Sequence, residues 1–368
     1  MARREICSSF LEALILSGIR GQMAPLSLGS MNIDANQLLE IRGEKAEQLR
    51  NAGQKTRDRI FGNTAFVRGV VEVSNYCREN CSYCGMRRDN RALTRFRIER
   101  DKIIRMIDVG LPAMVTDLNL QAGEDPQVID EIVIPIVRYI RAHTKLGVSL
   151  SLGTLSASQY EALRDAGAFY YIIKLETGDS VHYRELHAPG TYEERLETIR
   201  LLANSGWKVS SGMIMGLPGQ SLEMIAQTIK ILIELPLAGV SVSPFIPGEE
   251  TPFANEKPSE IDSTINALAI LRIASPERII PAVSAMSLLG RGSYVKALRA
   301  GANLVTMNLT PAKERNDYLL YKRGRTIMDQ EQIQRALDEA KLEASSVSMS
   351  DYLFSGINKP MDRVGAVV

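Results

Sequence analysis

The distribution of apolar residues predicts an alternation of strands and helices over most of the chain. Short runs rich in Val, Ile and Leu, or in alternating apolar and polar residues, predict strands. They lie near residues 66–74, 113–121, 147–152, 169–175, 207–215, 239–246, 278–284 and 302–307. The stretches between them carry apolar residues at helical spacing. Eight such units predict one (β/α)8 TIM-type barrel of the α/β class, and the count disfavours the alternative, a doubly wound open sheet.

The two ends of the chain depart from this pattern. Residues 1–60 are predicted as an N-terminal helical extension, residues 61–322 as the barrel and residues 323–368 as a C-terminal helical tail. Basic residues precede an apolar stretch near the start, but Glu12 interrupts it and no A-x-A-like cleavage site follows. An amphipathic helix is therefore favoured over a signal peptide. No apolar run reaches the roughly 18 residues of a transmembrane helix.

Composition narrows the function classes. The chain has 368 residues, of which 45% are hydrophobic and 24% charged, as in an ordinary globular protein with a large core. Its net charge of +1 argues against a nucleic-acid-binding surface and against a membrane anchor, because both need a basic excess. Four cysteines, three of them clustered, do not form a disulfide framework. A reducing, cytoplasmic setting is expected.

The clustered cysteines follow the first predicted strand directly. Cys77, Cys81 and Cys84 have C-x3-C-x2-C spacing, so their thiolates can surround one face of a metal site. A structural zinc site needs four protein ligands, and no nearby Cys or His supplies the fourth, since Cys7 lies 70 residues upstream. A 4Fe-4S cluster held by three cysteines instead leaves one iron open to an external ligand. We therefore predict one 4Fe-4S cluster on these cysteines and no ligand role for Cys7.

Other candidate residues lie where predicted strands end, which is where TIM-type barrels carry their chemistry. Gly123 and Glu124 follow the second strand, and a glycine beside a carboxylate suits a ligand with an ammonium group. Glu176 ends the fourth strand, and Arg195 opens the next long helix. Each has a simpler explanation: a turn for the first pair, a solvated acid for Glu176 and a helix-surface charge for Arg195. Acidic residues are absent three and four positions from Arg195, which weakens that last explanation.

These motifs together resemble the radical S-adenosylmethionine (SAM) superfamily. The resemblance implies that the open iron chelates the amino and carboxylate groups of SAM, and that Tyr83 belongs to the cofactor site. It also implies that Gly123 and Glu124 hold the SAM amino group, although Ala122 replaces the first glycine of that motif.

The remaining SAM contacts are likewise implied by the resemblance. Glu176 would bind the ribose hydroxyls and Arg195 the methionyl carboxylate, for which a guanidinium is suited. The segment GMIMGLPGQ, with Gly216, resembles the strand that lines the adenine, while Met213 and Met215 fit core packing.

Longer blocks resemble a narrower branch over roughly residues 35–325. SNYCRENCSYCGMRRDN, LQAGEDP, MGLPGQ, PFIPGEETPFANEK, IIPAVSAM and RAGANLVTMNLTP resemble, in order, the iron-only hydrogenase maturase HydE and its relatives. TYEERLETI is similar to part of biotin synthase, and methylornithine synthase shares the layout. The resemblance implies a barrel that closes over a small substrate, in which the reduced cluster cleaves SAM to methionine and a 5'-deoxyadenosyl radical.

The substrate side departs from HydE. The second cysteine group that many HydE proteins carry near the C-terminus is absent, and Val283 and Ser284 stand where HydE tends to have two threonines. The candidate substrate-binding residues are Gln121, Ser284, Thr306, Met307 and Tyr321. The expected partners are a small molecule and a one-electron reductant such as ferredoxin or flavodoxin. Other maturation proteins are further candidates, and neither a nucleic acid nor a membrane is expected.

Several functions remain open at this point. The leading hypothesis is a HydE-like enzyme acting on a small amino-acid-like or organometallic substrate. A carbon-skeleton mutase of the methylornithine synthase kind is the second, and it would need interior carboxylates for the ammonium groups of a diamino acid. Sulfur insertion ranks low, because Cys7 is the one cysteine left for an auxiliary cluster. A non-catalytic iron-sulfur protein is the remaining alternative.

Overall fold

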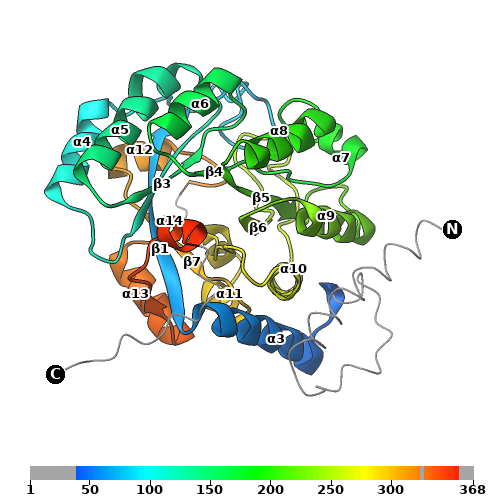
Figure 1. Cartoon of the computed structure of the whole chain (residues 1–368). Helices are drawn as coiled ribbons and strands as arrows, with labels where there is room; N and C mark the ends of the chain where they lie inside the picture. Colours follow the sequence, from blue (N-terminus) through cyan, green and yellow to red (C-terminus); the bar gives the residue numbers. More distant parts are fainter. Residues whose placement is uncertain (1–38, 324–326, 356–368) are drawn as a thin grey trace, which may run out of the picture.

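The computed structural model describes residues 39–323 and 327–355 and contains a ring of parallel strands surrounded by helices (Figure 1). Seven strands are hydrogen-bonded side by side in the order β6-β5-β4-β3-β2-β1-β7. They are β1 (Thr64–Ser74), β2 (Asp117–Ala122), β3 (Gly147–Ser151), β4 (Tyr170–Ile172), β5 (Lys208–Met215), β6 (Gly239–Pro244) and β7 (Leu304–Asn308). This arrangement confirms the predicted α/β barrel.

The predicted strand at residues 278–284 is replaced by an irregular segment. Single parallel bridges join Ile279 to Gly239 of β6 and Pro281 to Leu304 of β7, so this segment connects the two edge strands and completes the ring. Pro281 has no N–H to donate to a ladder, which explains why no regular strand forms. Ser284 already begins the short 3-10 helix η3 (Ser284–Leu288).

Helices occupy the connections between strands and cover the outside of the ring (Figure 1). Those that follow β1 to β6 are α4 (Arg100–Val109), the π-turn η2 (Ile129–Val133) with α5 (Ile134–His143), α6 (Ala157–Asp165), α7 (Ser180–Glu185), α8 (Tyr192–Asn204), α9 (Leu222–Glu234) and α10 (Ile261–Ala274). The short helices α11 (Ser293–Arg299) and α12 (Ala312–Asp317) flank β7. In the described part of the chain, no helix is both long and apolar enough to cross a bilayer.

The start of α8 illustrates how the sequence sets these boundaries. Thr191 accepts a hydrogen bond from the backbone N–H of Glu194, whose side chain accepts one from the N–H of Thr191. This capping box satisfies N–H groups that the first turn of a helix leaves unpaired. It fixes the first turn of α8, and with it the buried side chain of Arg195.

The segments before and after the barrel pack against it. Residues 1–38 lie outside the described residues, so the amphipathic helix expected there and Cys7 do too. Helix α3 (Gly43–Phe61) packs on α10 and α11 and leads into β1. The tail contains α13 (Gln330–Ala340) and α14 (Met349–Phe354), as predicted, and also a two-residue strand, β8 (Glu343–Ala344), which pairs with the start of β1.

Helix α14 closes the end of the barrel where the strands begin. It lies across the middle of the ring in Figure 1, drawn in red. Met349 is buried among Phe61, Phe66, Phe169 and Leu304, all at or next to strand starts. The backbone N–H of Met349 donates to the Asp117 carboxylate at 2.9 Å. Ligands therefore approach the interior from the opposite end, where the strands end.

Candidate functional site

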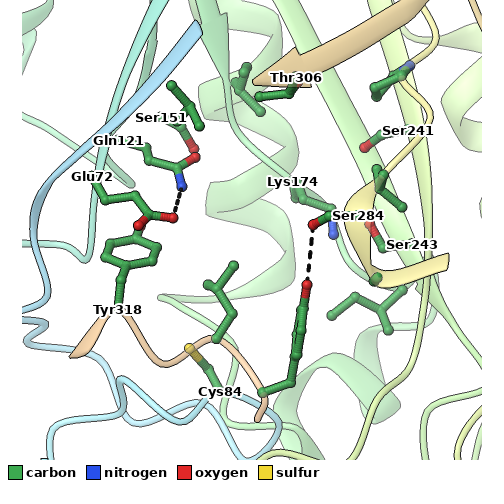
Figure 2. A pocket seen from close by; sticks show the side chains of 18 of the residues that line it. Glu72, Cys84, Gln121, Ser151, Lys174, Ser241, Ser243, Ser284, Thr306 and Tyr318 are labelled. Atoms are coloured by element: carbon green, nitrogen blue, oxygen red, sulfur yellow. Dashed lines mark hydrogen bonds between the residues drawn. The ribbon is translucent and has the colours of Figure 1, made fainter. Parts of the chain in front are cut away.

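A cavity of about 450 Å³ occupies the interior of the barrel. Inward-facing side chains from all seven strands line it, and Figure 2 shows several of them pointing into the space. At one end the lining includes Cys77, Cys81 and Cys84, and at the other it includes Arg68 and Leu304, near the strand starts. One cavity thus joins the cysteines to the closed end.

The three cysteines lie on a loop that leaves β1 (the cysteine loop, residues 75–90). The guanidinium of Arg95 donates to four backbone carbonyls of this loop, those of Asn75, Met86, Arg87 and Asn90. Burial raises the pKa of all three thiols, that of Cys84 to about 12. Thiols in this environment keep their protons until a metal binds and takes the place of those protons, because metal ligation requires the thiolate.

Gly123 brings the end of β2 into contact with the cysteine loop. A Cβ atom at this position would lie 2.2 Å from the carbonyl oxygen of Tyr76 and 2.8 Å from Cβ of Cys77, so a side chain does not fit. The next backbone N–H, that of Glu124, donates to Sγ of Cys77 at 3.4 Å. The residues predicted as a glycine–glutamate motif therefore lie directly beside the first cysteine.

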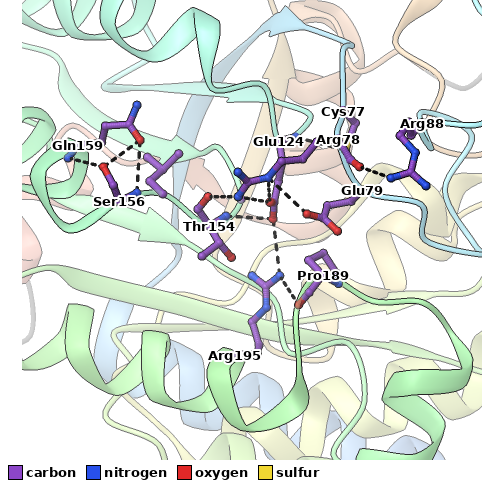
Figure 3. Close-up of polar contacts among 12 residues, drawn as sticks. Cys77, Arg78, Glu79, Arg88, Glu124, Thr154, Ser156, Gln159, Pro189 and Arg195 are labelled. Atoms are coloured by element: carbon purple, nitrogen blue, oxygen red, sulfur yellow. Dashed lines mark hydrogen bonds and ion pairs between the residues drawn. The ribbon is translucent and has the colours of Figure 1, made fainter.

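The Glu124 side chain is the centre of a buried charged network (Figure 3). Its Oε2 accepts from Arg78 Nη2 at 3.2 Å, and its Oε1 accepts from the backbone N–H of Thr154 at 3.0 Å and lies 3.7 Å from Nη2 of Arg195. Burial raises the pKa of Glu124, against the opposing effect of Arg195. Sequence reasoning assigned Glu124 and Arg195 separately, and the structure brings them together.

Arg195 is not a helix-surface charge. It is 5% exposed, its Nε donates to the hydroxyl of Tyr183 at 3.1 Å, and its Nη2 lies 3.4 Å from the carbonyl of Pro189. Burial acts to lower the pKa of its guanidinium, but Tyr183 and Glu124 raise it above the usual value. Arg195 is therefore a permanent cation at the edge of the cavity.

Gly153, which sequence reasoning missed, makes room for Glu124. Its φ of +76° is in the region that favours glycine, and a Cβ there would lie 1.9 Å from Cγ of Glu124. Gly153 directly follows the predicted strand at residues 147–152, and a glycine in that position was the sequence feature that could have identified it.

Glu176 lies in the cavity wall rather than in solvent. Its φ is +68°, an uncommon conformation for a residue other than glycine, and its Oε2 lies 2.8 Å from Nζ of Lys174. Both residues, two positions apart, line the cavity just beyond the end of β4, where Glu176 forms a single bridge with Met213 of β5. That spacing of two, KLE, was the signal for Lys174, which sequence reasoning also missed.

Three predicted residues are outside the cavity lining: Met307, Gly216 and Arg195, the last of which lies behind Glu124 and Pro189. Met307 is buried in the core between the strands and the helices, while its neighbours Thr306 and Asn308 line the interior, because side chains alternate along β7. We therefore withdraw Met307 as a substrate-facing residue. Gly216 lies outside the lining as well, with its N–H bonded to Oε1 of Gln220 at 2.7 Å.

The remaining predicted residues line the cavity. They are Tyr83, Gln121, Ser284, Thr306 and Tyr321. The hydroxyls of Ser284 and Tyr321 lie 3.3 Å apart. Gln121 donates to Oε1 of Glu72 at 3.3 Å (Figure 2). Asn308 donates to the same oxygen at 3.1 Å. Glu72 thus places a carboxylate in the wall, at a position not identified from the sequence.

Arg68 forms the floor of the cavity. It is buried, its Nη2 donates to Oγ1 of Thr306 at 3.2 Å, and its Nε has no hydrogen-bond partner among the described residues. Burial lowers the pKa of its guanidinium. Among the described residues Arg68 makes no ion pair, but the negative charge of the buried Asp117 acts in the opposite direction and raises the pKa of this guanidinium. A buried cation therefore faces the end of the cavity.

A strap formed by residues 318–323 crosses the cavity on the side of the cysteines. The N–H of Gly85 donates to the carbonyl of Leu320 at 3.1 Å, and the N–H of Glu249 donates to the carbonyl of Tyr321 at 2.6 Å. The carboxylate of Glu249 accepts from the N–H of Arg323 at 3.0 Å. The strap therefore connects the cysteine loop to the loop after β6.

The donor set at the cysteines suits a cluster better than one ion. In the described part of the chain, no three His, Cys, Asp or Glu side chains converge closely enough to hold a single metal ion. Thiolates around one zinc ion lie within about 4 Å of one another, because each Zn–S bond is about 2.3 Å. In a cubane cluster each of three cysteines would bind a different iron, and one iron would remain open.

Comparison with known proteins supports the same assignment. The Radical SAM superfamily model matches residues 71–232. The [FeFe] hydrogenase maturase subunit HydE of Thermotoga maritima is 35% identical over 75% of this chain and 79% of that protein. The 3-methylornithine synthase of Methanosarcina barkeri is 27% identical over 79% of this chain and 83% of that protein.

Among solved structures, that of methylornithine synthase (PylB) superimposes with a TM-score of 0.77 at 24% identity, covering 90% of this chain and 97% of that one. At this identity the similarity establishes the fold. The similarity to HydE over most of both chains establishes the family. The chain therefore belongs to the radical SAM superfamily, whose enzymes use a 4Fe-4S cluster and SAM, in the branch that includes HydE and 3-methylornithine synthase.

Proposed function

We propose that this enzyme binds a compact substrate with an anionic group at the floor of the barrel and SAM near the cysteines. The observation that carries the proposal is the single cavity that connects Cys77, Cys81 and Cys84 to the buried guanidinium of Arg68. When bound, the reduced cluster supplies the electron that splits SAM into methionine and a 5'-deoxyadenosyl radical, which abstracts hydrogen from the substrate. A cavity of about 450 Å³ suits a small molecule rather than a protein or a nucleic acid.

The cofactor side of the site is assigned to residues around the cysteine loop. The three cysteines hold the cluster as thiolates, with Sγ of Cys77 stabilised by the N–H of Glu124. Gly123 and Glu124 receive the SAM amino group, Glu176 the ribose, and Arg195 the methionyl carboxylate. The buried network around Glu124 supports this assignment, because it keeps both a carboxylate and a guanidinium fixed beside the cysteines.

The substrate side is assigned to the residues deeper in the barrel. Arg68 with Thr306 receives a carboxylate or a similar anionic group, for which a guanidinium offers several donors. Gln121, Ser284 and Tyr321 supply further hydrogen bonds. A HydE-like substrate, amino-acid-like or organometallic, fits this lining, and a reducing cytoplasm remains the expected setting.

A mutase of the methylornithine synthase kind is the second candidate, and Glu72 favours it. Its carboxylate, which accepts from Gln121 and Asn308, gives the cavity wall a negative charge beside the cationic floor. A diamino acid needs such a pairing of opposite charges. The two candidates differ in what they convert. The mutase would rearrange the carbon skeleton of an amino acid, whereas the HydE-like enzyme would not turn over lysine.

The proposal is tested with anaerobically reconstituted protein, SAM and dithionite. Lysine-derived and cysteine-derived amino acids are added one at a time, and release of 5'-deoxyadenosine and deuterium transfer from labelled substrate are measured. We expect slow release without substrate and a marked acceleration by one of these small molecules. If only a macromolecule accelerates release, the proposed substrate class is wrong.

Iron content provides a matched control for the cluster assignment. By the ligand count, reconstituted protein should hold about four irons per chain. Cys77→Ala should abolish the cluster absorbance and SAM cleavage, whereas Cys7→Ala should preserve both. About eight irons per chain, or loss of the cluster in Cys7→Ala, would contradict the assignment.

A further inference from the structure

We propose that Arg95 is a positioning residue for the cluster: its side chain closes the cysteine loop, and its positive charge makes the cluster easier to reduce. The inference rests on the proposed function in one respect, since it takes Cys77, Cys81 and Cys84 as the cluster ligands. It adds a residue outside the ligand set that controls both the retention of the cluster and its reduction potential.

The guanidinium of Arg95 joins the two ends of the cysteine loop. It donates to the backbone carbonyls of Asn75 at 2.6 Å, Met86 at 2.9 Å, Arg87 at 2.7 Å and Asn90 at 3.2 Å. The first of these carbonyls precedes Cys77 by two positions, and the other three follow Cys84. One side chain therefore connects the backbone on both sides of the cysteines.

The segment that carries Arg95 is itself fixed to the start of the loop. The N–H of Phe96 donates to Oδ1 of Asn75 at 2.7 Å, and the N–H of Asn75 donates to the carbonyl of Phe96 at 3.3 Å. Nδ2 of Asn75 also donates to the carbonyl of Thr94 at 2.8 Å. These bonds fix the backbone on both sides of Arg95, so its guanidinium is held in one position relative to the loop.

No carboxylate neutralises the charge of Arg95. Arg97, two residues further along, pairs with Asp125 at 2.7 Å, whereas Arg95 makes no ion pair among the described residues and is bound to neutral carbonyls. Burial lowers the pKa of the Arg95 guanidinium, and the negative charges of Cys77 and Cys84 oppose that effect. Arg95 is thus a cation placed where it attracts negative charge on these two sulfurs.

A fixed cation at this place favours the reduced state of the cluster. An external one-electron reductant loses one electron and the oxidised cluster gains it, and no bond is made or broken. The cluster and its thiolates together become more negative by one charge. A neighbouring positive charge stabilises the more negative state, so it raises the reduction potential.

Two substitutions separate the role of the guanidinium fork from that of the charge. Arg95→Lys keeps the positive charge, but a single ammonium does not reproduce a planar fork of donors. Arg95→Met removes both. Arg100→Met, at the exposed start of α4, is the matched control for the loss of one positive charge.

Two measurements are made on each anaerobically reconstituted protein. The rate of iron release to a chelator reports how firmly the loop holds the cluster. The midpoint potential is obtained by titration with a low-potential reductant and redox mediators, followed by the EPR signal of the reduced cluster. If Arg95→Met takes up too little iron for the titration, Arg95→Gln, which keeps two N–H donors, is titrated in its place.

We expect both Arg95→Lys and Arg95→Met to release iron at least about tenfold faster than wild type, because the loop loses carbonyl contacts. Arg95→Met should also have a potential lower by at least about 59 mV, which corresponds to a tenfold fall in the equilibrium constant for one-electron reduction. The potentials of Arg95→Lys and Arg100→Met should stay close to that of wild type. Equal potentials in Arg95→Met and Arg100→Met would overturn the role of the charge, and wild-type iron release in Arg95→Lys would overturn the role of the fork.

The wild-type protein separates this inference from the proposed function. If it holds about four irons and cleaves SAM with dithionite, while the Arg95 variants match it in iron release and potential, this inference alone is wrong. If wild-type protein holds no cluster or does not cleave SAM with dithionite, the proposed function itself is wrong.

Discussion

Two charged residues of β1, Arg68 and Glu72, point into the barrel from a strand that is mostly apolar. They are four positions apart, so both face the interior, and the strand between them is buried on both sides. A charge inside a buried strand is costly unless a partner compensates it. Glu72 is compensated by hydrogen bonds from Gln121 and Asn308, whereas Arg68 makes no ion pair among the described residues, so the cost of burying Arg68 is consistent with the proposed role in ligand binding.

Arg68→Met tests that argument. Removing Arg68 relieves the cost of burying its charge but also removes an attraction to the buried Asp117 carboxylate, so the midpoint of thermal unfolding should change by less than about 2 °C. The same change should abolish acceleration of SAM cleavage by a carboxylate substrate, while the affinity for SAM stays within about twofold of wild type because Arg68 lies at the far end of the cavity. A lower unfolding midpoint together with normal turnover would make Arg68 a structural residue.

Arg195 carries a separate prediction about the cofactor. Truncating one member of a desolvated charged contact costs roughly 2 to 5 kcal/mol, so Arg195→Ala should weaken SAM binding by at least about 30-fold, measured by titration of the reconstituted protein. Arg200→Ala, on the exposed side of the same helix, is the matched control. An unchanged dissociation constant in Arg195→Ala would remove Arg195 from the SAM site.

Among individual residues, the sequence alone identified those that belong to motifs with fixed spacing. The three cysteines, Gly123 and Glu124 are read from adjacent letters. Arg68 was missed because its role depends on which face of β1 is inside, and Met307 was misplaced for the same reason on β7. Lys174 was missed because it lies in the irregular segment just beyond β4. The facing of β7 is set by its pairing with β1, which a single sequence does not contain.

Among the elements, the turn after β3 is as important to the site as the cysteine loop. Gly153 in this turn leaves the space that Glu124 occupies. Gly153→Ala should therefore displace Glu124 and weaken SAM binding at least about tenfold, which corresponds to about 1.4 kcal/mol.

Gly110→Ala is the control for backbone strain. Gly110 also has a positive φ, +102°, but a Cβ there would meet no atom within 4 Å. Gly110→Ala should lose roughly 1–2 kcal/mol of stability from backbone strain alone and keep its SAM affinity, whereas Gly153→Ala should lose more stability and also SAM affinity. Equal SAM affinities in the two variants would show that the contact with Glu124 is unimportant.

If helix α14 closes the end of the barrel where the strands begin, substitutions at its buried positions should reduce stability. Met349 is fully buried, so Met349→Ala should lower the free energy of unfolding by about 2–5 kcal/mol, measured by urea denaturation. Phe354→Ala, at a position that is 58% exposed in the same helix, should cost about 1 kcal/mol or less. Similar losses in both would mean that α14 does not seal the barrel.

The elements were predictable where the apolar runs were long, and less so elsewhere. Strands β1, β2, β3, β5, β6 and β7 overlap the predicted runs, and β4 is a short version of one. The run at 278–284 is apolar but contains Pro281, which prevents a regular ladder. Strand β8 and the position of α14 could not be read from the tail, because both depend on contacts with residues more than 200 positions away.

At the scale of the whole molecule, the fold and the cofactors follow from features that one sequence displays, whereas the substrate does not. The alternation of elements and the cysteine spacing are repeated or compact patterns. The substrate is selected by side chains from strands β1 to β7, whose mutual positions arise only when the barrel closes. The charged groups Arg68 and Glu72 in the cavity support the proposed class of substrate, a small anionic or zwitterionic compound, which the turnover assay with candidate amino acids tests.

Helix α14 closes the far end of the barrel, and the strap of residues 318–323 crosses its near end. This arrangement also imposes an order on ligand binding and product release. With SAM seated beside the cysteines, a molecule on the Arg68 floor has no exit. Substrate must then load before SAM, and its product must leave last. Isotope trapping checks this: substrate bound first should be carried to product when excess SAM is added, rather than exchanging with an unlabelled chase.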